Sequence, residues 1–152
     1  MEAGQNSLYI FIDRSVDVYA LIAVEERVLT KVRRSLKWVV HFKKLSRREK
    51  KCFLKAFYKR FKKVVKYLTY SRIAYSPEEI YRFLCSLNLA EYIIYCDDPL
   101  SKWLKRRGYK AFPESRIPPN LRPLMLLADN LANYSRIMRE KGRIEKIREL
   151  IK

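Results

Sequence analysis

The chain has little glycine, cysteine or histidine, and few acidic residues for its length of 152. Three glycines exclude a collagen-like or flexible low-complexity chain. Three scattered cysteines and a single histidine, His41, indicate neither a disulfide framework nor a structural zinc site. No apolar run approaches the roughly 18 residues of a membrane span. Met1–Ser7 also lacks the basic and apolar stretches of a signal peptide. These absences predict a soluble, cytoplasmic protein.

The shortage of acidic residues leaves a net charge of +18, from 34 Lys and Arg against 16 Asp and Glu. Between Lys31 and Arg72 there are 17 basic residues and one acid, Glu49. Thermophile surfaces rich in lysine balance it with glutamate, which is missing here. A basic stripe of this density releases counterions when it meets phosphates. We therefore expect nucleic acid as the partner, in preference to an acidic protein or a membrane surface.

Apolar residues make up 49% of the chain and aromatic residues 13%, which is enough for a packed core. No linker or repeat divides the sequence. We therefore predict one domain over residues 1–152, with a short helix or tail at 143–152.

Short apolar runs predict a sheet. Leu8–Asp13, Asp17–Val24 and Lys37–Phe42 are expected to form three antiparallel strands, because short connections favour hairpins. Glu91–Cys96 indicates a further buried strand, and Tyr109–Phe112 a short one. The first two runs are almost continuously apolar, as in strands covered on both faces.

Helix signals follow the hairpin strands. Ser46 and Glu49 form a capping box at the start of a long helix with one apolar face. Further helices are expected after Ser76, with Asp98 as the cap of a third and Asn120 as the cap of a last one. Strands followed by alternating helices and strands predict an α/β fold, with a mixed sheet that has helices on both faces. The apolar face of the long helix comprises Phe53, Phe57, Phe61, Val64 and Leu68.

The basic face of the long helix and a second basic cluster further along the chain are the expected nucleic-acid interface. Side chains of this kind hold the phosphate backbone without reading the base sequence. Exposed tyrosines beside them can stack on unpaired bases, which favours a single-stranded substrate, although most tyrosines are expected in the core. The interface residues are Lys37, Lys51, Lys55, Lys59, Lys62, Lys63, Lys66, Lys102, Lys105, Arg106 and Arg107.

Three acids stand next to apolar segments in this basic chain. Asp13 and Asp97 each end a predicted strand, and Asp129 lies within the apolar run Leu124–Ala132. Burying a carboxylate costs several kcal/mol unless it is paired or binds a metal. Because ligands collect at strand ends in such sheets, we expect the three carboxylates to converge. An all-oxygen site of this kind suits Mg²⁺ or Mn²⁺.

Each of these acids also has a purely structural interpretation. Asp13 can form a local turn with the following backbone amides. Asp98, unlike Asp97, is explained as a helix cap. Pairing of Asp129 with Arg122 or Arg136 is disfavoured, because neither stands three or four residues away.

The order of these elements along the chain, with the three acids at two strand ends and on the last helix, resembles that of the ribonuclease-H-like superfamily. Within it, the chain is similar to an uncharacterised family with an N-terminal D-E-S-G-D motif and a C-terminal L-A-D-x-x-A motif. The corresponding segments here are Asp13–Asp17 (DRSVD) and Leu127–Ala132 (LADNLA), and the resemblance covers about Leu8 to Arg136. It implies a ribonuclease-H-like mixed sheet and a metal-dependent nuclease.

The chain departs from that pattern at the first motif. Arg14 replaces the usual Glu, and Val16 replaces the usual Gly, so one acid is gone and the turn is less permissive. No glutamate of the long helix takes the role of the helical glutamate of ribonucleases H, because Glu49 is expected to cap. Asp17 or Asp98 is then the candidate fourth acid.

The expected reaction is two-metal hydrolysis of phosphodiester bonds. The resemblance implies that Asp13 bridges two Mg²⁺ or Mn²⁺ ions, while Asp97 and Asp129 each hold one. The alternative is a non-catalytic nucleic-acid-binding module, which the charge supports equally well and which would be indifferent to EDTA. A packaging protein is a third interpretation, but it predicts basic tails rather than a basic helix.

Overall fold

A five-stranded mixed sheet forms the centre of the computed structural model, which describes residues 7–152. Met1–Asn6 lie outside the described residues. The start of the predicted domain 1–152 and most of the segment Met1–Ser7 therefore also lie outside them. The strand order is β3-β2-β1-β4-β5. β2 is antiparallel to β1 and β3, and β4 is parallel to β1 and β5. The predicted α/β class with a mixed sheet is confirmed. The strands are β1 (Leu8–Ser15), β2 (Val18–Glu25), β3 (Tyr70–Ala74), β4 (Tyr92–Cys96) and β5 (Ala111–Pro113).

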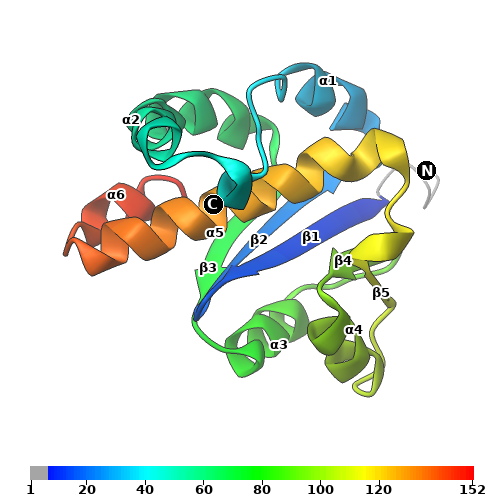
Figure 1. The fold of residues 1–152 in the computed structure, drawn as a ribbon. Coiled ribbons are helices and arrows are strands. Elements are labelled where there is room, and N and C mark those ends of the chain that lie inside the picture. Colours follow the sequence, from blue (N-terminus) through cyan, green and yellow to red (C-terminus); the bar gives the residue numbers. More distant parts are fainter. Residues whose placement is uncertain (1–6) are drawn as a thin grey trace.

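Helices cover both faces of the sheet, as predicted (Figure 1). One face carries α1 (Leu29–Arg34), α2 (Arg47–Val64), α5 (Arg122–Glu140) and α6 (Ile144–Arg148). The other face carries α3 (Pro77–Ser86) and α4 (Asp98–Lys105). No helix within residues 7–152 is long and apolar enough to cross a membrane. Short 3₁₀ turns connect these elements: η2 (Glu26–Val28), η3 (Phe42–Lys44), η4 (Val65–Tyr67), η5 (Glu114–Arg116) and η6 (Pro119–Leu121).

The central strands bury side chains on both faces, which explains their nearly continuous apolar sequences. In β1, Phe11 packs with the side chains of α2 and α5, whereas Ile10 and Ile12 pack on the side of α3 and α4. Because successive strand residues point to opposite faces, Asp13 and Ser15 share the face of Phe11. That alternation directs both side chains towards α5.

The long helix α2 forms as its sequence predicts. Ser46 accepts a hydrogen bond from the Glu49 amide at 3.1 Å, and the Glu49 carboxylate accepts one from the Ser46 amide at 2.8 Å. The two bonds satisfy donors that a helix start leaves open. Phe53, Phe57 and Phe61 are buried one turn apart and fasten α2 to the core, which leaves all its lysines except Lys50 exposed.

The predicted strand Lys37–Phe42 is wrong. This segment is a loop that leads into η3, and the third antiparallel strand is Tyr70–Ala74, which follows α2. Tyr70–Ala74 pairs with β2, so the earlier segment cannot take that place in the sheet. Its apolar residues Trp38, Val39 and Val40 instead pack against the core beside α5.

Two predicted helix caps are also wrong. Asp97, not Asp98, is the N-cap of α4, because its carboxylate accepts a hydrogen bond from the Leu100 amide at 2.8 Å. Asp98 is the first helical residue and pairs with Lys102 at 3.3 Å. Asn120 does not cap α5, whose start follows directly from the 3₁₀ turn η6. The predicted short terminal helix is present as α6.

Candidate functional site

Three acidic side chains gather at one edge of the sheet, where the parallel strands end. Asp13 comes from β1, Glu114 follows β5 directly, and Asp129 lies in the middle of α5. All three line a cavity of about 310 Å³. His41 and Arg122 supply basic side chains to the same cavity. The cavity therefore offers clustered carboxylate oxygens within a strongly basic protein.

Asp13 carries the largest electrostatic effect in this cavity. Burial, repulsion by Glu114 and contact with Asp129 together raise its pKa to about 8, although its backbone neighbour opposes the shift. The opposing contact is a hydrogen bond that the Arg14 amide donates to Asp13 Oδ1 at 2.8 Å. Burial and the neighbouring carboxylates also raise the pKa of Glu114, whereas a hydrogen bond with Asp13 and the charge of His41 lower it. Ionising both carboxyls together is therefore unfavourable without a compensating cation.

Asp129 is held by donors on three sides. It is 8% exposed, and its Oδ2 accepts hydrogen bonds from the Phe42 amide and from Asn130, both at 3.3 Å. Its Oδ1 accepts one from Asn133 Nδ2 at 3.2 Å. Within residues 7–152, Asp129 forms no ion pair with Arg122 or Arg136, as its spacing predicts. These bonds hold its carboxylate in a fixed position beside Asp13.

The loop that replaces the predicted third strand is part of this arrangement. Asn130 donates a hydrogen bond to the Val40 carbonyl at 2.7 Å and accepts one from the Val40 amide at 3.3 Å. With the bond from Phe42 to Asp129, these contacts fix the loop against α5. They also place His41 at the cavity.

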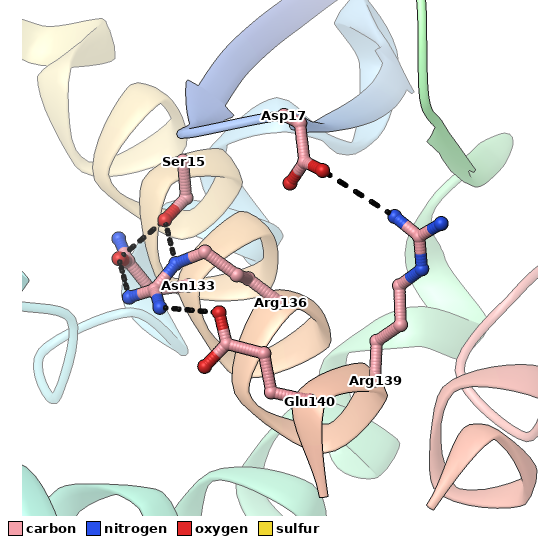
Figure 2. Close-up of polar contacts among 6 residues, drawn as sticks. All are labelled: Ser15, Asp17, Asn133, Arg136, Arg139 and Glu140. Atoms are coloured by element: carbon pink, nitrogen blue, oxygen red, sulfur yellow. Dashed lines mark hydrogen bonds and ion pairs between the residues drawn. The ribbon is translucent and has the colours of Figure 1, made fainter. Parts of the chain in front are cut away.

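A polar network joins the end of β1 to α5 on the other side of Asp129 (Figure 2). Arg136 Nε donates to Ser15 Oγ at 2.7 Å, and Ser15 Oγ donates to Asn133 Oδ1 at 2.8 Å. Asn133 in turn donates to Asp129. An ion pair between Asp17 and Arg139, at 3.7 Å, fastens the adjacent turn, as Figure 2 also shows. The turn, the helix and the carboxylate thus form one connected unit.

Asp97 does not occupy the position that was predicted for it. It is not among the residues that line the cavity, and one of its oxygens caps α4. Its charge still reaches Glu114 and contributes to the raised pKa of that residue. The candidate fourth acids are engaged elsewhere, Asp17 with Arg139 and Asp98 with Lys102. Glu114 takes the place beside Asp13 that the prediction gave to Asp97.

Sequence reasoning missed Glu114, Asn130 and Asn133. Glu114 comes shortly after the predicted strand Tyr109–Phe112, so the argument that selected Asp13 and Asp97 would have selected it too. The two asparagines lie on the same helix as Asp129, within the apolar run or just past it. Buried amides need hydrogen-bond partners, and this requirement was the available signal.

The cluster is not a preformed coordination shell. Within residues 7–152, no group of three or more His, Cys, Asp or Glu side chains has a geometry that could hold a metal ion. The contacts are pairwise, between Asp13 and Asp129 and between Asp13 and Glu114. The donors are nonetheless all carboxylates, which is the chemistry that Mg²⁺ and Mn²⁺ prefer.

The predicted basic residues fall into two separate groups. α2 and η4 carry one group on the α5 side of the sheet, and Lys37 lies exposed in the loop nearby. α4 and the turn after it carry Lys102, Lys105, Arg106 and Arg107 on the opposite side (Figure 1). Arg107 stacks on Trp103, with its guanidinium carbon 3.5 Å from the ring centre. The two groups therefore do not form one continuous surface.

No protein-family model matches the chain, and the search of curated proteins found no significant match.

Proposed function

We propose that this protein is a divalent-metal-dependent nuclease with a ribonuclease-H-like fold, acting on nucleic acid. One observation carries the proposal: Asp13, Glu114 and Asp129 share a cavity in a chain with a net charge of +18. A protein this basic attracts phosphates, and a cluster of acids at its surface would repel them. A cation held between the acids and a phosphate removes this conflict.

The topology supports the same proposal. Three antiparallel strands in the order β3-β2-β1, extended by parallel β4 and β5, match the arrangement that the resemblance implies. The acids lie beyond the carboxyl ends of β1 and β5, which is where α/β sheets collect ligands. Asp129 comes from the helix that crosses the same edge.

The residues of the cavity fit Mg²⁺ or Mn²⁺ by donor type. Asp13 interacts with both Glu114 and Asp129, and the three carboxylates would hold the cation together. The Phe42 amide and Asn133 hold Asp129 in place. When bound, such a cation acidifies an attacking water and offsets charge on the phosphate. His41 and Arg122, at the same cavity, are placed to contact phosphate oxygens. In this proposal Asp97 caps α4 and adds only negative charge nearby.

The alternative is a nucleic-acid-binding module without catalysis. It is favoured by the lack of a preformed coordination group within residues 7–152. In this alternative the acidic cavity has a structural role only. It then gives no reason for burying Asp13 beside two other acids, an arrangement that raises its pKa and costs stability.

The test is cleavage of labelled single-stranded oligonucleotides with Mg²⁺ or Mn²⁺, with and without EDTA. Asp13→Asn keeps the side-chain shape but removes the charge that would hold the cation. We expect it to reduce cleavage at least about 100-fold, since the cation supplies the proposed chemistry. Nucleic-acid binding should stay equal or become tighter.

Asp17→Asn is the matched control, because Asp17 is an exposed acid of the neighbouring turn that pairs with Arg139 and does not line the cavity. It should cleave like the wild type. Cleavage that survives EDTA and Asp13→Asn would point to a contaminating nuclease. No cleavage with any divalent ion would leave the binding module as the function.

A further inference from the structure

A basic hollow lies away from the acidic cavity, between α2, α5 and α6. Its volume is about 410 Å³. Five of its lining residues are cationic and none is acidic, and Leu54, Tyr58, Tyr134 and Met138 give it an apolar floor. Arg143 pairs with Glu145 at 3.8 Å, but within residues 7–152 the four lysines form no ion pair. The cationic residues are Lys51, Lys55, Lys141, Arg143 and Lys146.

A second basic hollow, of about 540 Å³, adjoins the first along α2. It is lined by Lys59, Lys62, Lys63 and Lys66 together with Tyr58. Tyr58 therefore lines both hollows and separates them. An ammonium group from each hollow lies near its ring, Lys146 at 4.8 Å and Lys62 at 5.5 Å from the ring centre. These contacts fix Tyr58 between two groups of lysines.

α6 is part of this arrangement, because its Lys146 lies over the Tyr58 ring and lines the first hollow. The neighbouring Glu149 raises the pKa of Tyr58 to about 12. Ile147 and Leu150 pack into the core and hold α6 in place. The first hollow is thus built by three helices, whereas the second is lined only by residues of α2 and η4.

We propose that the two hollows hold consecutive nucleotides of a single nucleic-acid strand, with phosphates on the lysines and bases against Tyr58, Leu54 and Met138. The ligand class rests on the proposed function. A hollow of a few hundred Å³ matches the size of a small-molecule site and accommodates one nucleotide unit rather than a duplex. Bases reach an apolar floor only when they are unpaired, and aromatic contact then adds affinity without base specificity.

The position of the first hollow suits a strand that also reaches the acids. Tyr134 lies on α5 little more than one turn beyond Asp129, about 8 Å along the helix axis. A strand lying in the hollows is therefore bound to the helix that supplies Asp129, although Asp129 and Tyr134 point to different sides of that helix. Duplex nucleic acid can meet the exposed lysines of α2 but not the apolar floor of the first hollow.

The test is binding of fluorescent single-stranded oligonucleotides in EDTA, so that cleavage is not needed. Lys141→Glu combined with Lys146→Glu changes the first hollow without touching α2. Arg82→Glu combined with Arg148→Glu is the control, since it changes the charge equally at exposed residues outside both hollows, one of them on α6 itself. Circular dichroism and thermal unfolding verify that both variants fold.

We expect the Lys141/Lys146 variant to lose at least about tenfold in affinity, and the control less than about threefold. The number of counterions released on binding, read from the salt dependence, should fall by about two in the Lys141/Lys146 variant. The wild type should prefer oligo(dT) or oligo(U) to a duplex and to an abasic strand of equal length. Equal losses in the two variants, or equal affinity for duplex and single strand, would overturn the proposal. Binding as expected without any cleavage would contradict the nuclease function alone.

Discussion

The acidic cavity and the basic hollows lie on the same side of the sheet but are built in opposite ways. The acids are half-buried or buried, close together, and held by donors from the loop, the turn and α5. All lysines of α2 except Lys50 are exposed, on a helix that its phenylalanines and Val64 anchor to the core. Like charges crowded out of water cost free energy, whereas exposed ones cost little. The comparison indicates that the cavity lowers the stability of the metal-free fold, a cost that the proposed cation would offset, whereas the basic face costs little stability.

The largest effect should follow from reversing charge on the basic face. We expect Lys55→Glu, Lys59→Glu and Lys63→Glu together to weaken binding of all sequences alike, by at least about 100-fold at low salt, because phosphate contacts are electrostatic. Glutamate keeps the helix propensity of α2. Filter binding over a salt series measures both the affinity and the slope. The control reverses Arg27, Arg82 and Arg148, which are exposed outside both hollows. Binding that does not depend on salt would contradict the prediction.

The acidic cavity should instead affect how the free energy of unfolding depends on pH. The pKa of Asp13 is about 8 in the folded protein, against about 3.9 for an unperturbed Asp. Below both values the two states are protonated alike. Between them the unfolded chain releases a proton that the folded chain keeps, so the free energy of unfolding falls as the pH rises towards 8.

Asp13→Asn removes this dependence. Thermal unfolding at pH 4 and pH 8 measures the difference in free energy of unfolding between the variant and the wild type. We expect this difference to be about 1–3 kcal/mol more in favour of the metal-free variant at pH 8 than at pH 4. Mg²⁺ should stabilise the wild type at pH 8 and leave the variant unchanged. Asp17→Asn should follow the wild type throughout. Parallel pH curves for wild type and Asp13→Asn would show that the acids do not interact.

Much of this contrast could be predicted from the sequence, because it depends on local signals. The capping box and the phenylalanine spacing define α2, and apolar runs identify β1, β2 and β4. The errors arose where tertiary pairing decided the outcome. Lys37–Phe42 has strand-like residues, but Tyr70–Ala74 takes the edge of β2. Asp97 and Asp98 are adjacent and both suit an N-cap, so local sequence patterns do not decide which of them begins α4.

Of the site, only those acids could be predicted whose own segment marks them, by a strand end or by apolar neighbours. Asp13 and Asp129 are marked in this way, and the structure brings them together. Glu114 depends on the path of the chain after a three-residue strand, and the asparagines depend on which loop lies over α5. Such contacts between distant segments are not encoded in the spacing of residues along one element.

The smallest effect concerns the turn between β1 and β2, whose neighbours Ser15 and Asp17 contact α5. Val16 has φ of 59° and is 75% exposed, so a β-branched residue adopts a left-handed conformation without burying its side chain. We expect Val16→Gly to stabilise the protein by about 0.5–1 kcal/mol, because relief of strain exceeds the added freedom of the unfolded chain. That corresponds to a rise of about 2 °C in the unfolding temperature for a domain of this size. Val16→Ala, which keeps the Cβ atom but removes the branch, should gain less. A Val16→Gly variant less stable than Val16→Ala would show that the Ser15 and Asp17 contacts to α5, and not the conformation of Val16, determine the stability of this turn.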